Sequence, residues 1–238
     1  MTRLPCRALN GTPPPLPLDL NIPTDRAQAR RDLVWGDHGF LRRRYGNFHH
    51  VGAGLFRGNQ PSPERLEWLA TLGIRTIINL RGPSEKGFYL LEREACDALG
   101  LCLIDYRMYS RDVHTVDAIL GAKGLFEAIE YPAFMHCKSG SDRTGIMGTL
   151  FKHFHLGQPI AQAVEQLSFR YGHMKRGKTG MLDHFFATYL RREAETGIAF
   201  EDWLRTEYDP PAVKAAFMGE WKTTLIGRMT TEKVLKRE

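Results

Sequence analysis

Short apolar runs alternate with helix-forming segments through the middle of this chain of 238 residues. Two of the runs, 74-IRTIINLR-81 and 132-PAFMHC-137, have the apolar or β-branched composition of buried strands. Strands that alternate with helices need crossover connections, and crossovers make neighbouring strands parallel. The alternation therefore predicts an α/β fold with a mainly parallel central sheet flanked by helices.

The expected elements follow from the same pattern. We expect strands at 55–57, 74–81, 101–109 and 132–137, and helices at 62–73, 85–98, 115–130, 143–155, 159–171 and 180–195. The first of these helices has Ser62 as its N-cap and Pro63 at its first position, both typical of a helix start, and it ends at Gly73. Residues 25–45 also have helical composition, but Gly36 and Gly39 interrupt it.

Composition narrows the classes of function. Hydrophobic residues make up 42% of the chain and charged residues 25%, which indicates a globular protein with a sizeable core. The net charge of +6 favours anionic partners such as phosphates or acidic headgroups. The positive charges do not form one long block, so we expect no nucleic acid partner. No apolar run is long enough for a membrane span. The N-terminal region reads 13-PPPLP-17 where a signal peptide would have an apolar core, so we expect a cytoplasmic protein.

The stretch 136-HCKSGSDRTG-145 joins a predicted strand to a predicted helix. Ligands of parallel sheets bind outside the carboxyl ends of the strands, where Cys137 lies. A helix start offers unpaired N–H groups, Gly140 allows the backbone to approach a ligand closely, and Arg143 can bind two phosphate oxygens at once. Such surroundings favour the thiolate of a cysteine. The stretch therefore predicts a cysteine nucleophile directed at a phosphate group.

This His-Cys-x5-Arg-Thr-Gly pattern resembles the signature of the cysteine-dependent protein tyrosine phosphatases. The resemblance implies that Cys137 attacks phosphorus, that Arg143 binds the phosphate, and that no metal or other cofactor takes part. It also implies that Thr144 assists the thiolate as leaving group and that His136 organises the loop. The phosphate-binding residues it implies are Lys138, Ser139, Gly140, Ser141, Asp142 and Arg143.

The wider chain resembles the atypical dual-specificity phosphatases of bacteria and fungi. The runs 54-GLFRGNQP-61 and 74-IRTIINLR-81 carry this similarity together with the cysteine loop, and it extends over about residues 45–195. We accordingly expect an N-terminal arm and helix at 1–46, a phosphatase domain at 47–195, and a helical extension at 196–238 that packs on the domain.

Three aspartates are candidates for the general acid that protonates the leaving oxygen. The phosphatase family places this aspartate in a loop after the preceding strand, and Asp112 in 109-YSRDVH-114 is our preferred residue. Asp105 has the better separation from the cysteine but lies inside a predicted strand. Asp142 lies in the loop itself, as does the proposed acid of the myotubularin lipid phosphatases.

The residues of the phosphate-binding stretch are compatible with protein and with lipid substrates. Lys138 follows the cysteine, as in lipid phosphatases of the phosphatase-and-tensin type, but Ser141 replaces the second lysine of that pattern. The cluster Lys175, Arg176 and Lys178 could contact a second phosphate or an anionic membrane, or simply face solvent. Arg57 and Arg81 follow strand segments, where they either frame the site or form structural ion pairs.

The expected function is thus a phosphomonoester hydrolase acting on phosphotyrosine and related phosphoproteins. A phosphoinositide or inositol-phosphate phosphatase with the same mechanism is the alternative. An inactive module that binds phosphorylated ligands is less favoured because the cysteine and arginine are both present, and an arsenate reductase or sulfur transferase lacks supporting cysteine spacing. His49, His50, His153 and His155 have no third ligand at metal-binding spacing.

Overall fold

The computed structural model describes residues 17–42 and 45–221, which divide into two compact units. The described parts of Met1–Met108 and Gly121–His173 form the first unit, and those of Tyr109–Leu120 and Met174–Glu238 form the second. The first unit holds the whole sheet and the Cys137 loop. The second holds Asp112.

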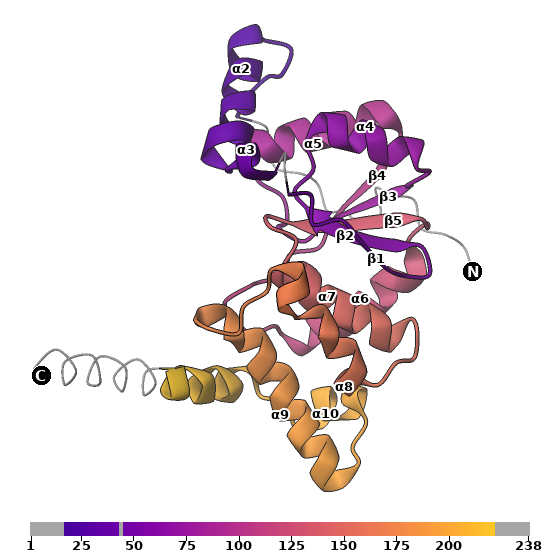
Figure 1. Ribbon diagram of the computed structural model, residues 1–238, viewed down its shortest axis with the longest axis vertical. Coiled ribbons are helices and arrows are strands. Elements are labelled where there is room, and N and C mark those ends of the chain that lie inside the picture. The colour runs from indigo at the N-terminus through magenta and orange to yellow at the C-terminus, as the bar shows by residue number, and fades with distance from the viewer. Residues whose placement is uncertain (1–16, 43–44, 222–238) are drawn as a thin grey trace, which may run out of the picture. The chain divides into compact units, whose positions relative to one another are not determined.

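A mixed five-stranded sheet is the centre of the first unit (Figure 1). Its strands are β1 (His49–Gly52), β2 (Leu55–Asn59), β3 (Thr76–Asn79), β4 (Cys102–Asp105) and β5 (Ala133–Cys137). They lie in the order β1-β2-β5-β3-β4, and every neighbouring pair is parallel except β1 with β2. This confirms the predicted α/β fold with a mainly parallel sheet. The antiparallel strand β1 was not among the predicted strands.

Helices lie on both faces of this sheet. The first unit contains α2 (Pro23–Arg31), the π-helical segment η1 (Asp32–Gly36), α3 (Gly39–Arg42), α4 (Pro63–Thr71), α5 (Gly87–Leu99), α7 (Asp142–Phe154), α8 (Ile160–Ala163), and the 3₁₀ turns η2 (Val164–Gln166) and η3 (Phe169–Tyr171). Figure 1 shows α4 and α5 on one face and α7 on the other. Ser62 caps α4 by accepting the Arg65 N–H at 3.3 Å, as its sequence predicts.

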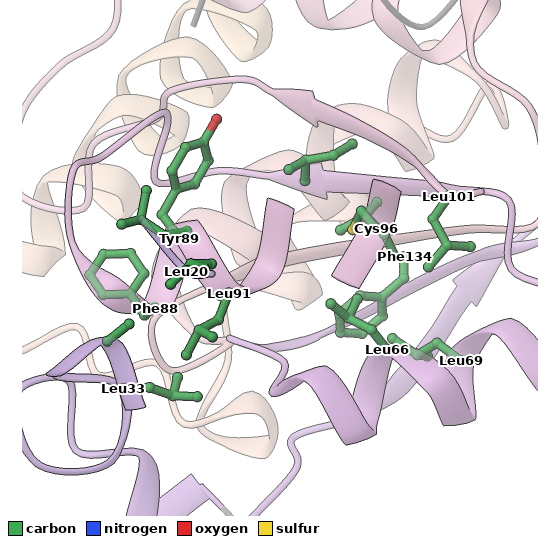
Figure 2. Close-up of a cluster of buried hydrophobic side chains, with 14 of the residues drawn as sticks. Leu20, Leu33, Leu66, Leu69, Phe88, Tyr89, Leu91, Cys96, Leu101 and Phe134 are labelled. Atoms are coloured by element: carbon green, nitrogen blue, oxygen red, sulfur yellow. The ribbon is translucent and has the colours of Figure 1, made fainter. Parts of the chain in front are cut away.

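The core between the sheet and α4 and α5 also includes residues from the start of the chain. Figure 2 shows Leu66 and Leu69 of α4 in the same cluster as Phe134 of β5, with Leu20 and Leu33 at its other end. Burying one leucine contributes roughly 1.5–3 kcal/mol. The segment around α2 and η1 therefore shares the hydrophobic core of the first unit. This packing fixes the position of the residues that follow the segment.

Two predicted elements differ from the structure. The predicted helix at 159–171 is α8 followed by the turns η2 and η3, because Ser168 is extended (φ −137°, ψ 163°). Apolar spacing alone does not reveal such a break. The strand predicted at 101–109 ends at Asp105, so this aspartate lies at the carboxyl end of β4 rather than in the middle of a strand.

The second unit is helical in its described part. It contains the start of α6 (Val116–Ala128), the 3₁₀ turn η4 (Lys178–Gly180), α9 (Met181–Thr196), α10 (Phe200–Thr206) and a helical stretch at 210–221. Phe185 and Phe186 are buried in its core, and the rings of Trp203 and Phe185 have their centroids 5.7 Å apart. In the part of the chain that is described, no helix has the length and apolarity needed to cross a membrane.

Candidate active site

Cys137 is the last residue of β5, and its thiol lies inside a tight loop that leads into α7. We call residues 137–143 the phosphate loop. The Cys137 side chain is buried and free, and its Sγ accepts the backbone N–H of Gly140 at 3.3 Å. A backbone amide within the loop is therefore directed at the sulfur, as an anion-binding loop requires.

Gly140 is required in the phosphate loop for two reasons. Its φ of +76° is in the left-handed region, which side chains other than glycine rarely adopt. A Cβ at this position would lie 2.6 Å from the backbone carbon of Gly58. The glycine spacing read from the sequence thus serves a close approach of the loop to β2.

Four consecutive carbonyls of the phosphate loop are held by the surrounding scaffold. The pairs are the Lys138 carbonyl with the Gln60 N–H (3.4 Å), the Ser139 carbonyl with Asn47 Nδ2 (3.0 Å), and the Gly140 and Ser141 carbonyls with Arg57 Nη2 (3.0 Å each). In a planar trans peptide the C=O and the next N–H point in opposite directions. The N–H groups of residues 139–142 are therefore turned away from these partners, as the Gly140 N–H to the sulfur illustrates.

Arg57 is the main support of the loop and is fully buried. Besides the two loop carbonyls, its guanidinium donates to the carbonyl and the side chain of Gln166 at 2.9 Å each and to Thr144 Oγ1 at 3.1 Å. It also lies over the Tyr171 ring at 4.2 Å from the centroid. Burial lowers the pKa of Arg57 to about 10, which the nearby Cys137 opposes, so it stays charged at neutral pH. Its positive charge lies directly behind the anion-binding loop.

Arg143 and Thr144 occupy the first turn of α7, where the helix offers its unpaired N–H groups. Among the residues that the structure describes, the buried Nε of Arg143 has no hydrogen-bond partner. A guanidinium nitrogen in this state is available to a phosphate oxygen. The Thr144 hydroxyl lies 3.4 Å from the Ser141 carbonyl, so it too belongs to the loop.

His136 lies behind the loop and is fully buried with Glu92, their Nε2 and Oε1 atoms being 2.6 Å apart. The second oxygen of Glu92 accepts from Gln60 Nε2 at 2.9 Å. Sequence reasoning missed Glu92, Gln60, Asn47 and Gln166. The one available signal was Glu92, a charged residue that directly follows the apolar run 88-FYLL-91, since a buried carboxylate needs a partner.

Arg81 is largely buried and forms a structural ion pair. It binds the Asp37 carboxylate through two bonds of 2.8 Å and the Gln60 side chain at 2.7 Å, and it covers the Phe88 ring at 3.6 Å. The same carboxylate lies 3.7 Å from Nζ of Lys138. Lys138, the lysine of the phosphate loop, and Arg81 thus share one acidic partner.

The three aspartates proposed as general acid have different surroundings. Asp105 accepts bonds from Tyr89 at 2.5 Å and Asn79 at 2.7 Å, and burial raises its pKa. Asp142 lies 2.7 Å from Nδ1 of the buried His173, so it is engaged within the first unit.

Asp112, in the second unit, is half exposed. It pairs with Lys214 at 2.8 Å and accepts the Val113 N–H at 2.8 Å. The hydrogen bond from Lys214 is the main reason why the pKa of Asp112 is lowered. Asp112 is thus an ionised carboxylate in these surroundings, and it must regain a proton to act as an acid.

The loop that carries Asp112 is fastened by a buried histidine of the same unit. His114 Nε2 accepts the Tyr109 N–H at 2.9 Å, and its carbonyl accepts the Tyr208 hydroxyl at 2.8 Å. Burial lowers the pKa of His114 to about 4. The histidine is therefore neutral in the folded protein at neutral pH.

This histidine predicts a loss of stability in mild acid. Between pH 6.5 and 4 the unfolded chain binds the His114 proton and the folded chain does not, so stability falls as pH falls through this window. We expect His114 to remove about 2 kcal/mol between pH 7 and pH 5. Thermal unfolding of the wild type and His114→Gln at both pH values measures this, and equal pH slopes for the two proteins would contradict it.

The other clusters noted in the sequence have ordinary contacts. His49 Nε2 lies 3.1 Å from Asn47 Oδ1, and His153 Nδ1 lies 2.8 Å from the Gln158 carbonyl. Across residues 17–42 and 45–221, no three histidine, cysteine, aspartate or glutamate side chains gather as a metal ion would need. Lys175 lies 3.7 Å from Asp183 within the second unit.

Three features occur together here. The parallel strand β5 ends in a buried cysteine, the phosphate loop directs an N–H group at its sulfur, and the helix that follows carries an arginine. This combination defines the class of cysteine-dependent tyrosine and dual-specificity phosphatases. A family model described as "DSP-PTPase phosphatase fused to NAD+ Kinase" matches residues 48–181. The chain belongs to this family.

Two relatives illustrate the likeness. The crystal structure of TpbA from P. aeruginosa matches with a TM-score of 0.50 and 19% identity over 68% of this chain and 90% of that chain, which shows the same fold. Inositol diphosphatase DSP4 of Arabidopsis thaliana is 27% identical over 106 residues, or 42% of this chain and 52% of the relative. The chain thus spans about half the length of that curated relative.

Proposed function

We propose that this protein is a phosphatase that hydrolyses phosphomonoesters through a phosphocysteine on Cys137. The observation that supports this most directly is the Gly140 N–H donated to Sγ, with the loop carbonyls held outward by Asn47, Gln60 and Arg57. Such a ring of amides stabilises the negative charge of the three equatorial phosphate oxygens during transfer.

The reaction has two steps. The Cys137 thiolate attacks phosphorus, an S–P bond forms, the P–O bond to the leaving group breaks, and the leaving oxygen takes a proton from the general acid. Water then attacks the phosphocysteine, the S–P bond breaks, and the carboxylate accepts the proton of the water. Arg143 binds two oxygens of the transferring group, and Thr144 assists the departing thiolate.

We keep Asp112 as the proposed general acid, with Asp105 and Asp142 as the alternatives. Asp105 and Asp142 are each held by partners of the first unit, which suits structural carboxylates. Asp112 and its partner Lys214 are both half exposed, so the Asp112 carboxylate can exchange protons with water.

Variants of the three aspartates separate these alternatives. The acid matters most for poor leaving groups, so Asp112→Asn is expected to lower kcat on phenyl phosphate by roughly 10²-fold and much less on para-nitrophenyl phosphate. Asp105→Asn and Asp142→Asn are expected to affect both substrates alike. If either of these two shows the leaving-group dependence instead, that residue is the acid.

The substrate that we favour is a phosphotyrosine-type phosphoprotein, with an inositol phosphate or phosphoinositide as the second candidate. The name of the Arabidopsis relative and the presence of Lys138 in the loop favour the second candidate. The Asp37 carboxylate beside Lys138 favours the first, because it already neutralises the cation that would hold a further phosphate.

A comparison of kcat/KM tests this choice. Phosphotyrosine peptides, soluble inositol phosphates and vesicles with phosphoinositides are assayed for phosphate release in the presence of a chelator. We expect the peptides to be the best substrates. A higher kcat/KM for an inositol phosphate or phosphoinositide would establish the second candidate, and hydrolysis of none would favour a module that only binds phosphorylated ligands.

The extent and location of the enzyme are also proposals. We propose residues 47–195 as the phosphatase domain, with the arm at 1–46 and the extension at 196–238 outside it. The family match at 48–181 falls within the proposed domain. We place the enzyme in the cytoplasm, because a reducing compartment keeps a nucleophilic thiol such as Cys137 from oxidation.

A further inference from the structure

Two cations at the carboxyl edge of the sheet share one carboxylate from the start of the chain. Arg81 follows β3, and Lys138 follows β5 in the phosphate loop. The Asp37 carboxylate binds Arg81 through two bonds of 2.8 Å and lies 3.7 Å from Nζ of Lys138. Asp37 is 4% exposed, whereas 44% of the Lys138 side chain remains exposed. The carboxylate therefore occupies the inner side of a cationic site next to the phosphate loop.

Asp37 is held in place by its own segment, which precedes the family match at residue 48. Its backbone N–H donates to the Asp32 carbonyl at 2.7 Å, and the Asp32 carboxylate accepts the Gly87 N–H of α5 at 2.7 Å. Gly87 lies so close to α2 that a Cβ there would be 2.4 Å from Cα of Ala29. Asp37 thus approaches the cations because the preceding helix is docked, not through a flexible side chain.

A guanidinium and an ammonium beside a phosphate-binding loop are the groups that bind a second phosphate of a substrate. In this protein the Asp37 carboxylate accepts two hydrogen bonds from the Arg81 guanidinium. A second phosphate of a substrate would make the same pair of contacts. A second phosphate must either displace Asp37 or approach it at the cost of like-charge repulsion.

We infer that Asp37 is a specificity-determining residue, which disfavours substrates that carry a further phosphate next to the one being hydrolysed. It selects isolated phosphate monoesters by neutralising Arg81 and reducing the charge near Lys138. This inference rests on the proposed function for the reaction itself, but it concerns anion binding and can be measured without turnover.

Calorimetric titration tests it with two ligands, inositol hexakisphosphate and inorganic phosphate. Removing the carboxylate charge frees the Arg81 guanidinium for a phosphate, so we expect Asp37→Asn to bind inositol hexakisphosphate about tenfold or more tightly relative to inorganic phosphate. Glu94→Gln is the matched control. It removes one negative charge, as Asp37→Asn does. It also breaks the ion pair between Glu94 of α5 and Arg26 of α2, and it leaves Asp37 unchanged. We expect no change in its affinity ratio.

A ratio in folded Asp37→Asn within about twofold of the wild type would overturn the inference, and so would an equal shift in Glu94→Gln. Thermal unfolding establishes that each variant is folded. Asp37→Ser, which also removes the charge, is the second variant if the asparagine destabilises the fold, with the same shift expected. Failure of the wild type to hydrolyse para-nitrophenyl phosphate would overturn the proposed function alone, because the titration needs no catalysis.

Discussion

Cys137→Ser is expected to reduce the hydrolysis of para-nitrophenyl phosphate by at least about 10⁴-fold, to the background of a protein without a nucleophile. A serine hydroxyl is not ionised at neutral pH, and the loop amides that face Sγ bind an anion rather than generate one. The binding of phosphate by Cys137→Ser should persist, because the loop carbonyls are fixed by neighbouring residues and not by the thiol.

Cys96→Ser is the matched control. Cys96 is the other described free thiol, and burial raises its pKa, so it is unreactive. It belongs to the core cluster shown in Figure 2, away from the phosphate loop in sequence. Iodoacetate should alkylate Cys137 first and remove activity in parallel. Retention of activity in Cys137→Ser would show that another residue carries the reaction.

Arg57→Met is expected to lower kcat by roughly 10²–10³-fold, although Arg57 is a positioning residue that acts through the loop. Its loss leaves the buried carbonyls of Gly140 and Ser141 without their donor, at a penalty of about 1–3 kcal/mol for each unsatisfied group. These peptides can then rotate, which takes N–H groups away from the phosphate. Arg57→Lys should recover part of the activity, since an ammonium can reach some of these acceptors but lacks the planar fork.

The measurement must separate a general loss of stability from a loss of loop geometry. Arg75→Met is a matched control, because the Arg75 side chain is 66% exposed and its ion pair with Glu130 spans 3.9 Å. At temperatures where all variants are folded, Arg57→Met should also show weaker inhibition by inorganic phosphate and slower alkylation of Cys137. If only the melting temperature falls and both readouts match the wild type, Arg57 is merely structural.

The sequence was sufficient to predict four of the five strands of the sheet and the loop that joins β5 to α7. The buried parallel strands β3 and β5 are rich in apolar and β-branched residues, so their composition reveals them directly. The phosphate loop is also local, because Cys137, Gly140 and Arg143 act through the backbone between them. The predicted strand, loop and helix at 132–155 correspond closely to β5 and α7.

The supports of that loop could not be predicted, because they come from distant parts of the chain. Asn47 lies 92 residues from its partner Ser139, and Arg57 lies 109 residues from Gln166. The sequence raised Arg57 only as a residue that either frames the site or forms an ion pair. Long-range contacts of this kind depend on strand order, and no local pattern encodes it. The same holds for Asp37, which lies in a segment that sequence alone described only as an interrupted helix.

The proposed reaction transfers a phosphate group to Cys137. The direct test is to mix the wild type with excess para-nitrophenyl phosphate, quench in acid within milliseconds, and map the modified peptide by mass spectrometry. We expect a phosphate on Cys137 in the peptide that contains 134-FMHCKSGSDR-143, and none in Cys137→Ser. Steady hydrolysis by the wild type with no phosphorylated cysteine, or with the phosphate on another residue, would contradict it.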